Sequence, residues 1–307
     1  MPVFSIVMPC FDAANTILDT IDSIQKQTLQ DWEMICVDDG STDLTTQLIA
    51  DAGQRDKRIK LVRNPGKGPS AARNFGASHI AAGTYIAFCD ADDIWATDKL
   101  AGVAHQFDIT PHDAVFGQIG FFVDDPAQAH VLSTVPTEPL TIDMLLGENP
   151  VCTMSNLSIR KDSFLEYGGF DPKVVHNEDL EWLIRLVGQG ATLGGMQALQ
   201  TWYRSNPNGL SADLAAMQAG RQHAIRTAKT FGVTPSPKAE AVYQRYLARR
   251  ALRLGQDKVW AAKTALRGLR QSPSGFLNPP RRGALTLVGA LSNLVLPRCF
   301  ARALFSQ

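Results

Sequence analysis

The sequence has no excess of either charge: among its 307 residues, 30 Lys and Arg residues balance 30 Asp and Glu residues. Proteins that bind nucleic acid usually carry a basic surface and a high net positive charge. The composition as a whole therefore gives no electrostatic reason to expect a nucleic-acid partner, and none is predicted.

Cysteine is scarce. The five cysteines are odd in number, widely spaced and mostly within apolar runs: Cys10, Cys36, Cys89, Cys152 and Cys299. This pattern is typical of reduced, buried thiols and predicts a cytoplasmic setting. The first four residues contain neither a charged segment nor a long apolar stretch, so no signal peptide is expected.

Two phosphate-binding motifs are missing. No Gly-x-Gly-x-x-Gly follows the first apolar run, which argues against a nicotinamide dinucleotide, and no Gly-Lys-Ser/Thr stands at P-loop spacing. The stretch Gly66-Lys67-Gly68-Pro69 could still offer N–H groups and a positive charge to a phosphate. Taken alone, this stretch is more simply interpreted as a plain turn before a helix that begins near Pro69.

The first hundred residues alternate between strand-like and helix-like segments. Short apolar runs predict strands at 4–8, 32–37, 59–62 and 85–88. Helical spacing predicts three helices, one following a possible Asn15 cap, one over 43–52 capped by Ser41 or Thr42, and one over 69–80. Alternation with short loops implies a parallel sheet in an α/β fold.

An acidic cluster follows two of these strands, at 37–41 (VDDGS) and 89–93 (CDADD). Each cluster by itself is also good turn or helix-cap chemistry. Their recurrence at strand ends, where open α/β sheets bind ligands, favours a functional interpretation. Asp90 and Asp92 are two residues apart and would point the same way in an extended chain, as ligands of a hard divalent cation would.

Seven stretches form an ordered series of motifs. They are 5–9 (SIVMP), 23–28 (SIQKQT), 37–43 (VDDGSTD), 68–74 (GPSAARN) and 88–93 (FCDADD), followed by 168–171 (GGFD) and 176–182 (HNEDLEW). In order and spacing they resemble a family 2 glycosyltransferase of the GT-A fold. The resemblance implies an open mixed sheet flanked by helices and a nucleotide-sugar donor.

The resemblance implies a role for each cluster. The first would meet the base, with Asp39 or Asp38 accepting the N3–H of uracil, although uracil is favoured over other bases by the family alone. Pro9 and Phe11 would line the base pocket, and Lys67 with Arg73 would stand on the phosphate side; Arg73 could equally be a solvated surface charge.

The second cluster would serve the metal. Asp92 would coordinate Mn²⁺ or Mg²⁺ bridging the diphosphate, while Asp90 would hold the ribose or a metal-bound water. Such an ion neutralises charge on a leaving diphosphate.

The acceptor hydroxyl must lose a proton as it attacks, so a carboxylate has to reach it. The family pattern gives this catalytic role to Asp179. Glu178 and Asp179 could also simply begin a helix, where acidic residues favour the positive dipole end. Both interpretations can hold together.

The resemblance divides the chain into a nucleotide-sugar-binding half at 1–105, an acceptor-binding half at 106–212 and, outside the clear resemblance, a helical region at 213–307. Arginine- and alanine-rich sequence with helical spacing at 243–254 predicts those C-terminal helices. The segment 203–211, whose arginine and serines could fold over the diphosphate, lacks the Gln-x-x-Arg-Trp pattern of processive synthases. Transfer of a single sugar to a glycan or lipid-linked acceptor is therefore expected.

An apolar stretch at 284–297 is flanked by Arg281, Arg282, Arg298 and Arg302 and is too short to span a bilayer, which takes roughly twenty residues. A buried helix or dimer contact is one interpretation. A peripheral membrane contact through 281–302 is the other.

Two other classes of protein share part of this pattern. A sugar nucleotidyltransferase should carry a glycine-rich basic loop after its first strand, and residues 9–12 (PCFD) are not that. A noncatalytic nucleotide-sugar-binding homologue would not need Asp90, Asp92 and Asp179 together. The stretch 107–154 contains no motif that identifies the acceptor.

Overall fold

The computed structural model describes residues 1–129, 131–205, 213–255 and 257–296. They divide into two compact units, one made of residues 1–140 and 150–206, the other of 141–149 and 207–307. The segment 141–149 thus belongs with the C-terminal helices, whereas the three-part division assigned it to the acceptor half. That division into donor, acceptor and helical parts remains a prediction.

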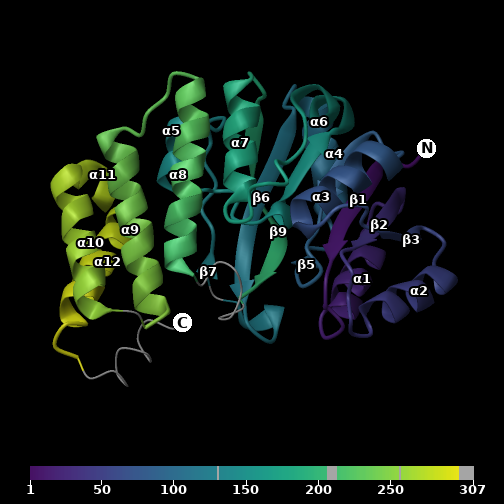
Figure 1. The fold of residues 1–307 in the computed structure, drawn as a ribbon, viewed down its shortest axis with the longest axis horizontal. Coiled ribbons are helices and arrows are strands. Elements are labelled where there is room, and N and C mark those ends of the chain that lie inside the picture. Colours follow the sequence, from purple (N-terminus) through teal and green to yellow (C-terminus); the bar gives the residue numbers. More distant parts are fainter. Residues whose placement is uncertain (130, 206–212, 256, 297–307) are drawn as a thin grey trace. The chain divides into compact units, whose positions relative to one another are not determined.

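The first unit contains a mixed sheet whose strand order is β3-β2-β1-β4-β8-β6-β9-β5, with β7 paired to β6 (Figure 1). The pairs among β3, β2, β1 and β4 are parallel, whereas β8 runs antiparallel to both β4 and β6. The strands are β1 (Phe4–Cys10), β2 (Trp32–Asp38), β3 (Ile59–Arg63), β4 (Tyr85–Phe88), β5 (Ile94–Trp95), β6 (Ala114–Phe122), β7 (Val131–Leu132), β8 (Leu157–Arg160) and β9 (Leu193–Arg204).

Helices flank this sheet, which confirms the predicted α/β class with an open mixed sheet. The α-helices of the first unit are α1 (Ile17–Gln25), α2 (Thr45–Arg55), α3 (Gly68–Phe75), α4 (Lys99–Ile109), α6 (Lys161–Tyr167) and α7 (Glu178–Gly188). A π-helical turn, η1 (Gly76–Ile80), extends α3, and short 3-10 turns lie at η2 (Pro126–Gln128) and η3 (Met154–Asn156).

Strand β1 shows why both faces of the sheet are covered. Its alternate residues Phe4, Ile6 and Met8 are fully buried in a cluster with apolar residues of α1 and α4. On the opposite face, Val7 approaches Gly76 so closely that an added Cβ at Gly76 would lie 2.6 Å from a Val7 methyl. Alternation along a strand thus places α1 with α4, and the α3–η1 segment, on opposite faces.

Parallel pairing brings the ends of three strands to one edge. Cys10 at the end of β1 pairs with Asp38 of β2, and Val7 pairs with Phe88, the last residue of β4. Because both acidic clusters directly follow these strands, the topology gathers them at one edge of the sheet, as predicted.

Two predicted helix caps are wrong. Helix α1 begins after Thr16 rather than Asn15, and α2 begins after Leu44, each without a side-chain cap. Ser41 and Thr42 instead pair with Asp12: the Asp12 N–H donates to Ser41 Oγ at 3.1 Å, and the Thr42 N–H donates to Asp12 Oδ1 at 2.7 Å. A contact 30 residues away in the chain competes with the local cap.

The prediction of buried thiols holds for Cys10, Cys36 and Cys89 but is wrong for Cys152, which is exposed. Cys152 follows α5 in a loop and has a positive φ of 67°, so its apolar neighbours in the sequence do not place it in the core. Cys299 lies outside the described residues.

The second unit is helical in its described residues. Its helices are α5 (Ile142–Gly147), α8 (Leu214–Thr230), α9 (Pro237–Arg253), α10 (Lys258–Gln271), α11 (Pro273–Leu277) and α12 (Pro280–Ser292). The predicted helix at 243–254 is confirmed as the later part of α9. Small buried residues, including Ala241, Ala248, Ala261 and Ala265, let α9 and α10 pack closely.

The predicted apolar segment at 284–297 corresponds to most of α12 and the residues after it. Residue 297 and the flanking Arg298 and Arg302 lie outside the described residues. Helix α12 has 13 residues. Within the described ranges, no helix combines the length and apolarity needed to cross a bilayer.

Trp182 anchors α7, the helix whose first turn carries Glu178 and Asp179. Its side chain is fully buried among Phe88, Phe164 and Phe170, and its Nε1–H donates to the Gly168 carbonyl at 2.9 Å.

We expect Trp182→Ala to lower the free energy of unfolding by about 3–5 kcal/mol, because it removes a large buried ring and leaves a cavity. Urea unfolding followed by circular dichroism measures the change. Leu44→Ala, at a side chain 66% exposed, is the control and should change stability by less than about 0.5 kcal/mol. Similar losses in both variants would show that Trp182 does not anchor the helix.

Candidate functional site

Asp38 and Asp39, which the sequence left as alternatives, have different surroundings. The Asp38 carboxylate accepts the N–H groups of Gly40 at 3.0 Å and of Ser41 at 3.2 Å. Gly40 has a φ of +90°, a conformation that favours glycine. Asp38 therefore closes the turn after β2, and its oxygens are occupied by that turn.

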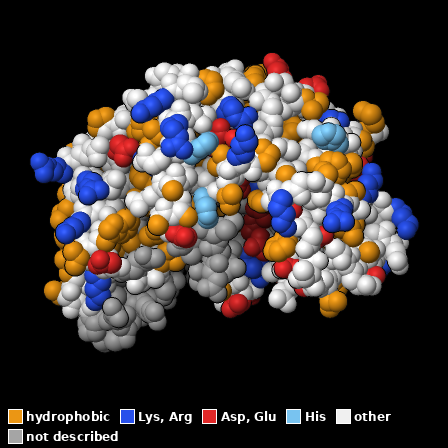
Figure 2. Space-filling model, viewed as in Figure 1, with side chains coloured by type: hydrophobic (Ala, Val, Ile, Leu, Met, Phe, Trp, Pro, Cys, Tyr) orange, Lys and Arg blue, Asp and Glu red, His pale blue; other side chains and the backbone are white. Residues whose placement is uncertain are grey.

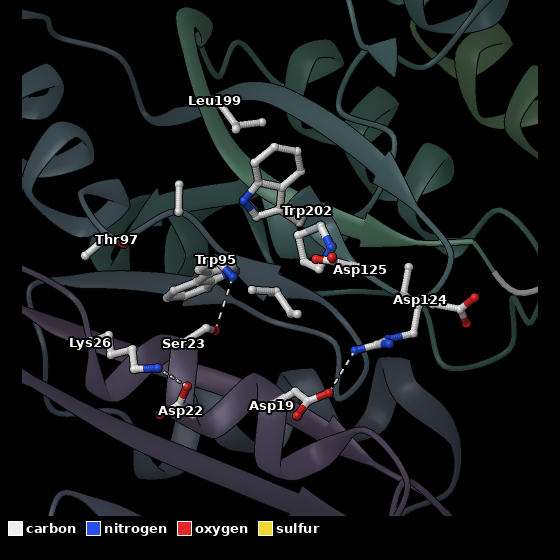
Figure 3. A pocket seen from close by; sticks show the side chains of 14 residues that line it. Asp19, Asp22, Ser23, Lys26, Trp95, Thr97, Asp124, Asp125, Leu199 and Trp202 are labelled. Carbon is white, nitrogen blue, oxygen red and sulfur yellow. Dashed lines mark hydrogen bonds and ion pairs between the residues drawn. The ribbon is translucent and has the colours of Figure 1, made fainter. Parts of the chain in front are cut away.

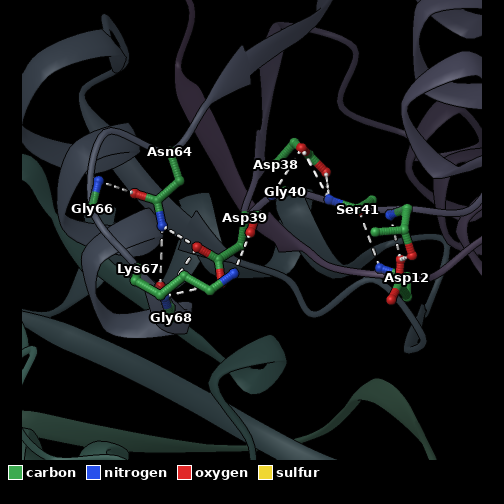
Figure 4. A network of polar contacts seen from close by, with 10 residues as sticks. Asp12, Asp38, Asp39, Gly40, Ser41, Asn64, Gly66, Lys67 and Gly68 are labelled. Atoms are coloured by element: carbon green, nitrogen blue, oxygen red, sulfur yellow. Dashed lines mark hydrogen bonds and ion pairs between the residues drawn. The ribbon is translucent and has the colours of Figure 1, made fainter.

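Asp39 faces the loop before α3 (Figure 4). Its carboxylate accepts the Gly68 N–H at 3.0 Å, accepts a hydrogen bond from Asn64 Nδ2 at 2.7 Å and pairs with Lys67 Nζ at 3.1 Å. The Asp39 N–H in turn donates to the Cys10 carbonyl at 2.8 Å. Asp39 is thus fixed between the ends of β1 and β2 and the start of α3.

The predicted base-pocket residues stand beside this network. Phe11 is 56% exposed, and Lys67 Nζ lies 4.9 Å from the centre of its ring. Pro9 is half-buried at the end of β1. The structure brings Pro9, Phe11, Asp39 and Lys67 to one edge, where an exposed ring can stack on a planar base and the ammonium can meet a phosphate.

Arg73 lies deeper than a surface phosphate ligand would. It is 4% exposed, and its guanidinium pairs with Asp90 at 2.7 Å and with Glu178 at 3.2 Å. It also lies 5.4 Å from the centre of the Phe170 ring. Arg73 is not the solvated surface charge that the sequence left open; it links the loop after β4 to the start of α7. Its role as a phosphate ligand remains a prediction.

Three carboxylates crowd the loop between β4 and β5. Asp93 is fully buried and accepts the Arg204 N–H at 3.0 Å, while Asp90 accepts a hydrogen bond from Thr153 Oγ1 at 3.0 Å. Burial, and then the negative charge of Asp90, raises the pKa of Asp92 to about 6. Burial, followed by repulsion from Asp92, raises the pKa of Asp93 well above its ordinary value.

This donor set fits a hard dication. Carboxylate oxygens are the ligands that Mg²⁺ and Mn²⁺ prefer, and a cation between Asp90 and Asp92 would relieve the repulsion that raises the pKa of Asp92. Within the described ranges, no three His, Cys, Asp or Glu side chains come together as a complete metal site. The remaining ligands of a cation would have to come from substrate and water, as is usual for Mg²⁺ bound to phosphates.

Asp179 is the second residue of α7, which begins with Glu178 after Asn177, a residue with a left-handed φ of 59°. Part of its side chain reaches solvent. Burial of the carboxyl group, and then the charge of Glu178, raises its pKa to about 7; Arg73 lowers this pKa, whereas Asp90 raises it. The predicted base is thus electrostatically coupled to the predicted metal-binding loop.

The sequence missed several residues that hold these groups. Asn64 and Thr153 hold Asp39 and Asp90, but neither stands in a recognisable motif. Arg204 lies in the segment expected to fold over the diphosphate; its Nε–H donates to the Asp92 carbonyl at 3.0 Å and its guanidinium pairs with Asp19 at 3.2 Å. The rest of that segment, 206–211, lies outside the described residues.

A cavity of about 600 Å³ opens beside the acidic loop and contains none of the predicted site residues. Figure 3 shows Asp19, Asp22 and Lys26 of α1 on one side and Trp95 and Trp202 of β5 and β9 on the other. Arg204, which contacts Asp92, also lines it. The cavity is therefore next to the candidate site but separate from Asp39 and Asp179.

The family profile described as "Glycosyl transferase family 2" matches residues 5–168, more than half of the chain. The chain belongs to glycosyltransferase family 2. This confirms the resemblance inferred from the motifs.

Curated relatives agree with this assignment. The putative teichuronic acid biosynthesis glycosyltransferase TuaG of Bacillus subtilis is 30% identical over 216 residues, covering 69% of this chain and 82% of that protein. The Escherichia coli protein WfaP, named UDP-Glc:alpha-D-GlcNAc-diphosphoundecaprenol beta-1,3-glucosyltransferase, is 28% identical and covers 69% and 81%. Other relatives match over only about a third of this chain and less than half of their own length.

A solved structure supports the fold independently. The mannosyltransferase PcManGT from Pyrobaculum calidifontis, in complex with GDP-Man and Mn²⁺, superposes with a TM-score of 0.60 over 98% of this chain and 83% of that one. The sequence identity is 19%, so this likeness shows a shared GT-A fold.

We expect Arg73→Met to lower the free energy of unfolding by about 3 kcal/mol, because it leaves Asp90 and Glu178 without their buried partner. Chemical denaturation measures the loss, and Arg73→Lys, which keeps the charge but not the two-armed fork, should recover only part of it.

Lys60→Met is the control for this variant. It breaks the ion pair to Glu33 at a lysine whose side chain is 49% exposed, where the cost should stay below about 1 kcal/mol. Equal losses at both positions would contradict a special role for the Arg73 bridge.

Proposed function

We propose that this protein transfers one sugar from a nucleoside-diphosphate sugar, with a UDP-sugar as the favoured donor, to a hydroxyl group of a glycan or lipid-linked acceptor in bacterial cell-surface polysaccharide synthesis. One observation carries the proposal. A carboxylate with a pKa near 7, Asp179, belongs to the same charged cluster as the acidic loop at Asp90, to which Glu178 and Arg73 connect it.

The donor would lie over the edge formed by β1, β2 and β4. Asp39 would meet the base and Phe11 would stack on it, whereas Asp38, whose oxygens close a turn, would support the pocket from below. Lys67, whose side chain is 74% exposed and pairs with Asp39, would exchange that ion pair for a phosphate. The name of WfaP includes UDP-Glc, and PcManGT holds GDP-Man. We favour a UDP-sugar because WfaP, at 28% identity, is more similar to this chain than PcManGT, at 19%.

A divalent cation held by Asp90 and Asp92 would neutralise charge that develops on the leaving diphosphate. Asp179 would take the proton of the acceptor hydroxyl, and a pKa near 7 suits that task, because a large fraction of such groups is ionised at neutral pH and each is basic enough to accept a proton. Attack from the face opposite the diphosphate inverts the anomeric centre, so that an α-linked donor gives a β-linked product. The β-1,3 linkage in the name of WfaP is consistent with this.

The direct test incubates the protein with UDP-glucose, UDP-N-acetylglucosamine or GDP-mannose, Mn²⁺ and a GlcNAc-diphospholipid acceptor. Mass spectrometry should detect nucleoside diphosphate and a glycosylated acceptor, and NMR of the anomeric coupling should show inversion. Release of pyrophosphate would instead identify a nucleotidyltransferase. Nucleotide-sugar binding without any turnover would identify a binding protein.

We expect Asp179→Asn to lower the rate of transfer about a hundred- to ten-thousand-fold while UDP binds with near-normal affinity, because the amide keeps the shape but cannot accept a proton. Stopped-assay kinetics and calorimetric titration of UDP measure the two effects. Asp162→Asn, at an exposed carboxylate of α6, is the control. An active Asp179→Asn enzyme would contradict the assignment of the base.

The pH dependence provides a second test of the base. Asp179 must be ionised to act, so kcat/KM should rise with pH and level off above about 7. Glu178→Gln removes the neighbouring negative charge and should move this rise to lower pH. An unchanged profile in the Glu178→Gln enzyme would show that a group other than Asp179 titrates.

The contribution of Asp179 to the stability of the fold should fall with rising pH, whereas its contribution to activity should rise. Because the folded-state pKa of Asp179 exceeds that of an unfolded aspartate, its contribution to stability is present below about pH 4 and is lost as the pH rises through about 7. Asp179→Asn should therefore unfold at a temperature no lower than the parent protein at pH 8. Thermal denaturation at pH 5 and pH 8 distinguishes lost chemistry from lost folding.

We expect Asp92→Ala to abolish turnover, because it removes one of the carboxylates proposed to hold the cation. The parent enzyme should lose activity in chelator and recover it with Mn²⁺, and Mn²⁺ bound per chain, measured by electron paramagnetic resonance in the presence of UDP, should fall in the variant. Asp98→Ala, at an exposed residue of the same segment, should behave as the parent. Full activity of Asp92→Ala in chelator would overturn the metal assignment.

A further inference from the structure

The zero net charge of the chain is the sum of two large and opposite charges. The C-terminal unit has sixteen Lys and Arg residues against five Asp and Glu residues, a net charge of +11. The first unit has fourteen against twenty-five, a net charge of −11. Such an asymmetry between parts of a chain indicates an anionic partner for the basic part.

Three of the arginines of this unit surround one carboxylate. Glu148, just after α5, pairs with Arg245 at 3.2 Å, with Arg249 at 3.3 Å and with Arg282 at 3.7 Å. Burial lowers the pKa of Arg245, and the nearby Arg282 and Arg249 lower it further. A single carboxylate thus leaves an excess of positive charge where α9 meets the start of α12.

Helix α12 has a face of apolar side chains directed toward solvent. Leu285 and Val288 are each 62% exposed and Leu291 is 40% exposed, at the spacing of one helical face that begins with the exposed Arg281. The opposite face of α12 is buried and is formed by Gly283, Thr286, Gly289 and Ala290. The apolar exposure continues beyond the helix at Leu294 and Val295.

These two features restrict the partner. A nucleic acid would use the arginines, but its phosphates offer nothing to a row of leucine and valine. An anionic bilayer satisfies both, because acyl chains accept the apolar face while headgroup phosphates meet the arginines. Figure 2 shows Lys and Arg side chains standing among hydrophobic ones over the C-terminal helices.

We propose that the C-terminal unit docks on an anionic phospholipid surface, with α12 lying in the interface along Leu285, Val288 and Leu291 and the arginines at its start facing headgroup phosphates. With 13 residues, α12 is too short to span a bilayer and lies on it instead. The proposal rests on this unit alone and does not depend on the proposed transfer reaction, although such a surface is where a lipid-linked acceptor resides.

Vesicle flotation of the full chain tests the docking. Binding is expected to vesicles that contain phosphatidylglycerol, with little binding to pure phosphatidylcholine, and it should weaken as salt is raised, because screening reduces the attraction. Leu285→Gln combined with Val288→Gln should weaken binding about tenfold or more, and Arg281→Gln about fivefold. Circular dichroism should show unchanged helicity in these variants.

The control is Leu44→Gln combined with Ile109→Gln, at side chains of the first unit that are 66% and 61% exposed; its binding should equal that of the parent. The proposal fails if the parent does not float with anionic vesicles, or if the Leu285/Val288 variant floats as well as the parent. Binding to a fluorescent DNA or RNA duplex that is tighter than vesicle binding and insensitive to Leu285 and Val288 would identify a nucleic-acid surface instead. Sugar transfer to a soluble acceptor, measured in parallel, separates this outcome from that of the proposed reaction.

Discussion

The site depends on one buried guanidinium. Arg73 extends from α3 between Asp90, which follows β4, and Glu178, the first residue of α7, and these two carboxylates lie 88 residues apart in the sequence. Without a cation between them, like charges at this edge would repel one another and be costly to bury. Because Arg73 belongs to α3, which begins at Gly68 and has Pro69 in its first turn, the position of the proposed base is tied to the loop proposed to hold a metal.

Negative charge remains in excess even with Arg73 in place. The carboxyl groups of Asp92, Asp93 and Asp179 all have raised pKa values, and burial is the largest cause for each. A fold that keeps several carboxylates partly dehydrated gives up stability at neutral pH, which is a common feature of sites that bind charged ligands. Lys67 and the Phe11 ring lie at the same edge of the sheet, beside Asp39. Together these groups suit a ligand that combines a planar base, phosphates and a dication.

The two units use charge in opposite ways. The first concentrates carboxylates around a small number of cations, whereas the second surrounds Glu148 with arginines and exposes an apolar helix face. The zero net charge of the whole chain hides this division. The absence of an electrostatic reason to expect a nucleic-acid partner therefore holds for the total composition and not for the basic unit by itself. Whether the basic unit binds nucleic acid or lipid therefore depends on the surface of that unit, and the exposed leucine and valine side chains of α12 favour lipid.

Local signals in the sequence predicted the alternation of strands and helices in the first hundred residues, a parallel sheet and the family, because apolar patterns of period two and period 3.6 and ordered motifs can be recognised without the fold. It also indicated Asp39, Asp90, Asp92 and Asp179 as site candidates. The tertiary structure was needed to distinguish Asp38, which closes a turn, from Asp39, which faces the loop before α3. It was also needed to show that Arg73 lies between two carboxylates and that Cys152 is exposed. These outcomes depend on contacts between residues far apart in the chain, such as Asp12 with Thr42 and Arg73 with Glu178. Burial and charge pairing are set by which distant segments meet, and a local pattern does not contain that information.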